Sequence, residues 1–126
     1  MRDHPPSAYR KTARLLKAAA HPVRLAILEL LGEYGEECVC HMEAALGYRQ
    51  AYLSQHLMAL REAGLVEDRR EGRNIFYRVI RPELAVHFRD MRETFGPPEP
   101  QRRASSAACA CPKCAREEPL DLAQKA

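Results

Sequence analysis

Residues 42–79 read MEAALGYRQAYLSQHLMALREAGLVEDRREGRNIFYRV, and this stretch decides the fold. The pattern predicts a short helix over 39–46, a turn at Gly47 and a second helix over 49–63. The apolar residues of the second helix repeat at helical spacing: Leu53, Leu57 and Leu60. Two short helices joined in this way are typical of a helix-turn-helix, whose second helix presents polar side chains to the DNA major groove.

The chemistry of the pattern changes after Gly64. Two strands are predicted over 65–70 and 75–80, joined by a polar turn that contains Gly72, because the second run is rich in branched and aromatic residues. The expected fold class is therefore mainly α with a small β-hairpin, a winged helix-turn-helix.

Further helices are predicted on both sides of this unit. One covers about 8–20, and a second starts at Pro22 and is ended by Gly32 and Gly35. Pro82 opens a last helix with a large apolar stripe, Leu84, Phe88, Met91 and Phe95. Such a stripe on a terminal helix needs a partner surface.

The polar side of the second helix supplies the candidate DNA-reading residues. They are Arg49, Gln50, Ser54, Gln55 and His56, with Tyr52 suited either to a phosphate or to the core. Arginines around the hairpin turn are candidate phosphate contacts: Arg69, Arg70 and Arg73. The alternative is that both sets are ordinary solvated surface, and the combination in this order favours DNA binding.

Length and charge restrict the function further. The 126 residues suffice for one ordered domain, and a formal charge of +3 permits a DNA partner without demanding one. Because no apolar run reaches eighteen residues, we expect a cytoplasmic protein with no membrane segment. A nucleophile elbow, a phosphate loop and a suitable carboxylate pair are all missing from the sequence, which argues against an enzyme.

Five cysteines form two groups, Cys38 with Cys40, and Cys109 with Cys111 and Cys114. In a reducing cytosol, such spacing favours metal binding or redox sensing over structural disulfides. Residues two apart in a regular helix point about 200° away from each other. Cys38 and Cys40 are therefore expected to meet one ion only if the helix start is unwound or distorted.

The chain after about Gly96 is rich in proline, serine, alanine and charge, and it reads as a flexible tail. We expect a DNA-binding and dimerisation domain over 1–95 and a cysteine-containing tail over 96–126. The segment from Phe95 to Cys109 spans up to roughly 45 Å, enough to bring tail thiols to the first cysteine group. The alternative is a tail that binds metal or forms a disulfide independently.

The stretches AHPVRLAILELL and ECVCHMEAALGYRQAYLSQHLMALREAGLVEDRREGRNIFYRV, within about 20–79, resemble the ArsR/SmtB family of metal-responsive repressors. The resemblance implies a homodimer formed by the first and last helices. It also implies binding to a palindromic double-stranded operator, and release when an inducer binds.

Within this resemblance, Cys38-Val39-Cys40 is similar to the family's inducer-binding motif. Arsenic-sensing relatives can place a third cysteine where this chain has Glu43, and cadmium- and lead-sensing relatives use an N-terminal cysteine that is absent here. We therefore expect the tail thiols to complete a site for As(III)/Sb(III) or Cd(II)/Pb(II), with Zn(II) also compatible. His41 is a further candidate ligand for zinc, or a surface or capping residue.

Two alternatives remain open for the cysteines. One is a redox- or persulfide-sensing repressor of the same fold, because thiolates at a helix start can be activated. The other is a metal-buffering protein in which the helical domain is a scaffold. The family's zinc site on the last helix is not expected, because Glu83, His87 and Asp90 do not reproduce its spacing.

Overall fold

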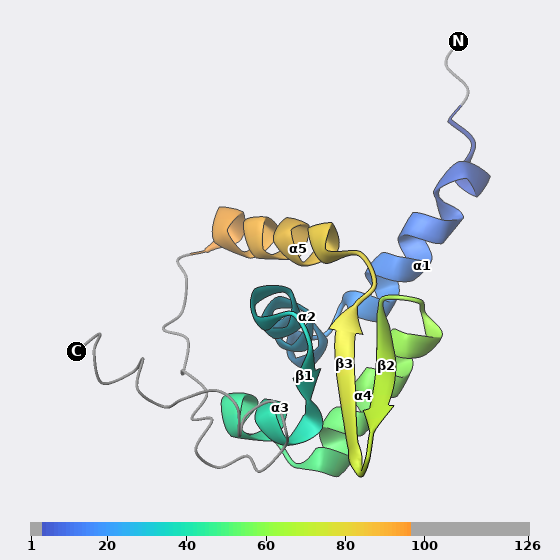
Figure 1. The fold of residues 1–126 in the computed structure, drawn as a ribbon. Coiled ribbons are helices and arrows are strands. Elements are labelled where there is room, and N and C mark those ends of the chain that lie inside the picture. The colour runs from blue at the N-terminus through green and yellow to red at the C-terminus, as the bar shows by residue number, and fades with distance from the viewer. Residues whose placement is uncertain (1–3, 97–126) are drawn as a thin grey trace.

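The computed structural model describes residues 4–96 (Figure 1). The elements in chain order are η1 (Pro6–Tyr9), α1 (Arg10–Ala19), α2 (Pro22–Tyr34), β1 (Glu37–Cys38), α3 (Val39–Leu46), α4 (Gln50–Glu62), β2 (Val66–Glu71), β3 (Asn74–Val79) and α5 (Pro82–Phe95). The predicted helices and the hairpin are confirmed, and together they form a winged helix-turn-helix. The tail cysteines Cys109, Cys111 and Cys114 lie outside the described residues.

The sheet contains a strand that the sequence pattern did not predict. Its order is β1-β3-β2, and both pairings are antiparallel. Strand β1 pairs only Glu37 with Tyr77 and Cys38 with Phe76. The wing is thus joined directly to the segment that carries the first cysteine.

Helix α2 continues through Gly32, contrary to the expectation that this glycine ends it. The helix ends at Gly35, the second glycine named for this end, and its φ of 83° is a left-handed conformation. A Cβ atom on Gly32 would lie only 2.3 Å from the Cβ of Ala85 in α5. The glycine is therefore explained by close packing of α2 against α5, which crosses it in Figure 1.

The main core lies between the helices and the sheet. Its fully buried members include Ile27, Leu28, Leu31, Met42, Leu53, Leu57, Leu60 and Leu65. The predicted inner face of α4 is therefore confirmed. The apolar stripe of α5 divides: Leu84 and Phe88 pack on this core, whereas Met91 and Phe95 are 48% and 85% exposed.

No helix within residues 4–96 is long and apolar enough to cross a membrane.

Candidate functional site

The helix-turn-helix consists of α3, a turn at Gly47 and α4. Gly47 has a φ of 76°, a left-handed conformation that glycine adopts without strain. Arg49 precedes the first residue of α4 and is exposed, as are Gln50, Tyr52 and Gln55, while Ser54 is half-buried. These side chains form the accessible side of α4, as the sequence pattern indicated.

His56 is an exception, because its expected outward position is wrong. Its side chain is only 8% exposed, and the Nε of Arg24 donates a hydrogen bond of 3.0 Å to its Nδ1. Arg24 also donates to the carbonyl oxygen of Ala18 at 2.9 Å. Burial, followed by the nearby His21 and Arg24, lowers the pKa of His56 below 6.5. His56 therefore packs the recognition helix against α2 in its neutral form and does not face outward.

Aromatic rings extend from this buried histidine to the surface. The ring centroid of His56 lies 4.4 Å from that of His21 and 4.7 Å from that of Tyr52. Tyr52 in turn lies 5.2 Å from Tyr48, which is 43% exposed. Tyr52 thus packs against His56 and also presents part of its ring to solvent. Tyr48, which sequence reasoning missed, places a second hydroxyl-bearing ring beside it.

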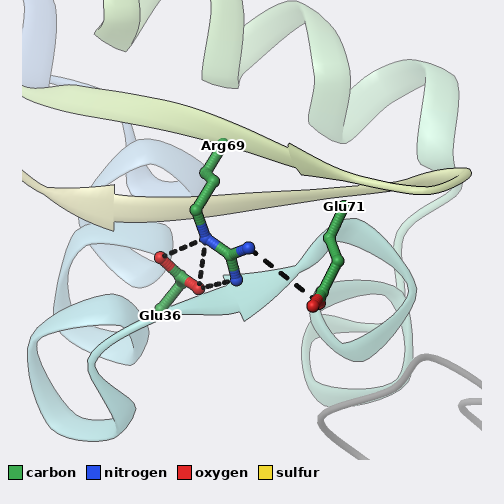
Figure 2. Close-up of polar contacts among 3 residues, drawn as sticks. All are labelled: Glu36, Arg69 and Glu71. Carbon is green, nitrogen blue, oxygen red and sulfur yellow. Dashed lines mark hydrogen bonds and ion pairs between the residues drawn. The ribbon is translucent and has the colours of Figure 1, made fainter.

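The wing arginines fall into two groups. Arg70 and Arg73 are exposed, and neither has an ion-pair partner within residues 4–96. Arg69 instead donates to Glu36 from Nε at 3.1 Å and from Nη2 at 2.5 Å, and its Nη1 lies 3.9 Å from Glu71 (Figure 2). The hydrogen bond to Glu36 is the main reason that the pKa of Arg69 is raised. The structure therefore engages Arg69 within the protein, and its expected phosphate contact stays a prediction.

The cysteine pair lies where β1 meets α3. Cys38 is the N-cap of α3, with extended backbone angles of −84° and 162°, and its sulfur accepts the backbone N–H of His41 at 3.4 Å. The sulfur atoms of Cys38 and Cys40 are 2.7 Å apart. This agrees with the expectation that they meet only where the helix start is unwound, because Cys38 has an extended backbone and precedes the first helical residue.

A small apolar cluster surrounds these sulfurs. Cys38 is 2% exposed and Phe76 is 1% exposed, and half-buried Cys40 packs against both. This cluster is separate from the main core. The cysteine segment is therefore in contact with the wing strand β3.

His41 lies beside a buried carboxylate at the start of α3. It is 3% exposed, and its Nδ1 lies 3.3 Å from the Oε2 of Glu37, which is fully buried. Within residues 4–96, no three histidine, cysteine or acidic side chains are grouped so that they could hold a metal ion. The same finding covers Glu83, His87 and Asp90 of α5, which are all exposed. The described residues thus bring two cysteine sulfurs together at one point.

Comparison with known proteins agrees with this geometry. Residues 21–68 match the family described as bacterial regulatory protein, arsR family. The chain is 44% identical over 89 residues to a biofilm growth-associated repressor of Agrobacterium fabrum, covering 71% of this chain and 75% of that protein. It is 46% identical over 66 residues to the arsenical resistance operon repressor of Escherichia coli, covering 52% and 56%.

A solved homodimeric winged helix-turn-helix DNA-binding domain from Mycobacterium bovis is also similar. It superposes with a TM-score of 0.62 at 35% identity, covering 75% of this chain and 87% of that one. These relatives are regulators rather than enzymes. The chain therefore belongs to the arsR family of bacterial regulatory proteins, and it is a transcriptional repressor of the winged helix-turn-helix fold.

Proposed function

We propose that this repressor is a homodimer that binds a palindromic operator and leaves it when a thiophilic ion binds Cys38 and Cys40. The observation that carries the proposal is the meeting of the two sulfurs, 2.7 Å apart, at the start of the first helix of the helix-turn-helix. Thiolate pairs favour soft ions, so the inducer class is As(III)/Sb(III) or Cd(II)/Pb(II), with Zn(II) compatible. The similarity to a repressor of an arsenical resistance operon supports this class.

The DNA-contacting residues are those left accessible on α4 and the wing tip. We assign base and phosphate contacts to Arg49, Gln50, Tyr52, Ser54, Gln55, Arg70 and Arg73. Glutamine amides match adenine, and arginine matches guanine or phosphate. The set can therefore both recognise bases and hold the DNA backbone. His56 is left out because its burial and its bond to Arg24 keep it from the surface.

Two apolar surfaces support dimerisation. Tyr9 of η1 and Leu16 of α1 are 50% and 46% exposed, and α5 exposes Met91 and Phe95. Covering large apolar groups of this kind is favourable, and the similar Mycobacterium bovis domain is homodimeric. A twofold dimer through the first and last helices presents two copies of α4, which explains a palindromic operator.

The remaining ligands are assigned to the tail. We divide the chain into a DNA-binding and dimerisation domain over 1–95 and a cysteine-containing tail over 96–126, acting in the cytoplasm. Pyramidal arsenic needs three sulfurs, and cadmium or lead needs three or four. Glu43 cannot supply a sulfur, so Cys109, Cys111 and Cys114 of either subunit complete the site.

The arrangement of the sulfurs explains how ligation weakens DNA binding. Two sulfurs bonded at about 2.3 Å to a tetrahedral ion lie about 3.8 Å apart. An ion held by both sulfurs fixes their separation, so the segment that carries Cys38 and Cys40 must adjust to the ion. Cys38 caps α3 and pairs with β3, so its movement displaces the first helix of the helix-turn-helix or the wing.

A second candidate keeps the DNA-binding role and makes the cysteines a redox or persulfide switch. It is favoured by the N-cap position of Cys38, where a backbone N–H and the helix dipole stabilise a thiolate. In that case peroxide takes two protons and two electrons from two thiols and becomes two waters.

One titration separates these functions. The reduced full chain is bound to a fluorescent duplex from its own promoter, and anisotropy is followed while arsenite, antimonite, cadmium, lead, zinc or peroxide is added. Release by one ion, lost in Cys38→Ser and Cys40→Ser, supports ion sensing. Release by peroxide alone supports the redox switch, and failure to bind any promoter duplex contradicts both.

The serine variants carry their own control. Serine is a good N-cap, so Cys38→Ser should keep α3 and bind DNA as well as the wild type before any ion is added. A variant with all three tail cysteines changed to serine tests the tail. If it still responds with wild-type affinity for the ion, the tail does not complete the site.

A further inference from the structure

We propose that Arg69 is a positioning residue that fixes the wing to the cysteine segment, and that it helps to transmit occupation of the cysteine pair to the wing. The second half of this statement rests on the proposed function. The first half rests on contacts among β1, β2 and β3 alone.

Three strands place one row of side chains across the sheet. Cys38 of β1 is paired with Phe76 of β3, and Phe76 is paired with Arg69 of β2. Directly paired residues project from the same face of a sheet, so these three side chains are neighbours. The guanidinium carbon of Arg69 lies 4.9 Å from the centroid of the Phe76 ring, and the same ring packs against the cysteines. Phe76 therefore lies between the sulfurs and Arg69.

A second connection runs along the edge of the sheet. Glu36 stands two residues before Cys38, in the segment that leads from α2 into β1. Its carboxylate accepts hydrogen bonds from two nitrogens of Arg69, a geometry that fixes the direction of the planar guanidinium (Figure 2). Arg69 is thus held to the cysteine segment through both Glu36 and Phe76.

Because of these two connections, a displacement of Cys38 should change the position of the wing. Strand β1 has only two residue pairs with β3, so little pairing resists its displacement. When Cys38 moves, Phe76 must move with it or lose its contact with the sulfurs. Glu36 must likewise shift or lose its hydrogen bonds with Arg69. Arg69 stands on β2 next to the exposed Arg70, and loss of its anchors changes how the wing tip is presented to DNA.

The sequence alone suggests a competing role, in which Arg69 contacts a phosphate directly. The chain offers two matched controls for separating these roles. Arg70→Gln removes an adjacent wing charge that has no ion-pair partner within residues 4–96, on the opposite face of the strand. Glu67→Gln removes a different wing ion pair, with Arg78, that does not include the cysteine segment.

The first measurement needs no inducer. The affinity of the reduced full chain for a promoter duplex is measured at several salt concentrations. Arg70→Gln should reduce the salt slope by about 0.9, as expected for one lost phosphate contact. Arg69→Gln should leave the slope unchanged. A slope reduced by about 0.9 in Arg69→Gln as well would overturn the positioning role.

The second measurement uses arsenite and compares DNA affinity with and without it. The wild-type ratio should lie in the range of about 5- to 150-fold that is usual for coupled sites. Arg69→Gln and Glu36→Gln should each reduce it at least about five-fold or abolish it, and the double variant should reduce it no further. Arsenite affinity, read from sulfur–arsenic ultraviolet absorption, should not change, and Glu67→Gln should keep the wild-type ratio.

The outcomes separate the two proposals. If arsenite releases the wild type and Arg69→Gln equally, transmission through Arg69 is overturned while cysteine sensing stands. If neither arsenite nor any other ion or peroxide releases the wild type, cysteine sensing and transmission both fail. An unchanged salt slope in Arg69→Gln would still support its positioning role in that case. Partial recovery of the ratio in the exchanged variant, Glu36→Arg with Arg69→Glu, would further support a direct link between the two residues.

Discussion

Replacing Gly32 by alanine should force α2 and α5 apart. The new Cβ would stand 2.3 Å from the Cβ of Ala85 and 3.8 Å from its Cα. Two carbon atoms in ordinary contact lie about 3.5–4.0 Å apart. The two helices must therefore separate locally by more than about 1 Å, and the Glu29–Arg92 contact between them must adjust as well.

Two opposing terms set the magnitude. Alanine is favoured over glycine within a helix by about 1 kcal/mol. Overpacking of a well-filled contact costs about 1–3 kcal/mol. We expect Gly32→Ala to lower the free energy of unfolding by about 1 kcal/mol. In an Ala85→Gly background the steric term disappears, so the same change should instead raise it by about 1 kcal/mol.

The assay is urea unfolding followed by far-ultraviolet circular dichroism. Protein concentration is held fixed, because a dimer's apparent stability depends on it. Gly96→Ala is the matched control, since its Cβ meets nothing within 4 Å and its φ of −170° suits any residue. If Gly32→Ala stabilises the wild type as much as it stabilises Ala85→Gly, the proposed contact between the two helices is refuted.

Three shorter predictions follow from other contacts. Arg73→Ala should reduce the salt slope of DNA binding by about 0.9, and an unchanged slope would argue against a phosphate contact. Because the pKa of His56 is lowered, the unfolded chain takes up a proton first as the pH falls below 6.5. Stability should therefore drop by up to about 1.4 kcal/mol per pH unit below that value, and His56→Gln should show a shallower drop in urea titrations at pH 5–7. Arg92→Met removes the ion pair with Glu29, which is partly exposed, so thermal melting should show a loss below about 1 kcal/mol.

The long elements of the fold were predictable because their patterns repeat. Three leucines on one face identify α4, and the branched and aromatic residues of 75–80 identify β3. Strand β1 was not predictable, because two residues carry no periodicity and their partners, Phe76 and Tyr77, lie far along the chain. Gly32 was misread as a helix end because its reason, the close approach of Ala85, is a tertiary contact.

The site was predictable in residue type but less so in orientation. Cys38 and Cys40 stand out by spacing, but the pairing of Cys38 with Phe76 of β3 is a tertiary contact that spacing does not reveal. His56 was assigned to the DNA surface because polar side chains usually face water, and the ion pair of the exposed Arg69 with Glu36 was not foreseen. Their partners, Arg24 and Glu36, stand 32 and 33 residues away, and a single sequence does not reveal such pairs.

The separation of the two apolar clusters favours sensing by a local movement over sensing by unfolding. The sulfurs pack with Phe76 in a small cluster, whereas α2 and α4 are held together by the main core. The recognition helix has two further anchors away from the sulfurs, Arg24 with His56 and Arg61 with Asp68 at 3.3 Å. Local opening takes the least free energy where few contacts are lost, and β1 has two residue pairs to lose. Displacement of Cys38 is therefore expected to change the start of α3 and the wing while α4 stays packed, so that the repressor leaves DNA as a folded protein and can bind again once its cysteines are restored.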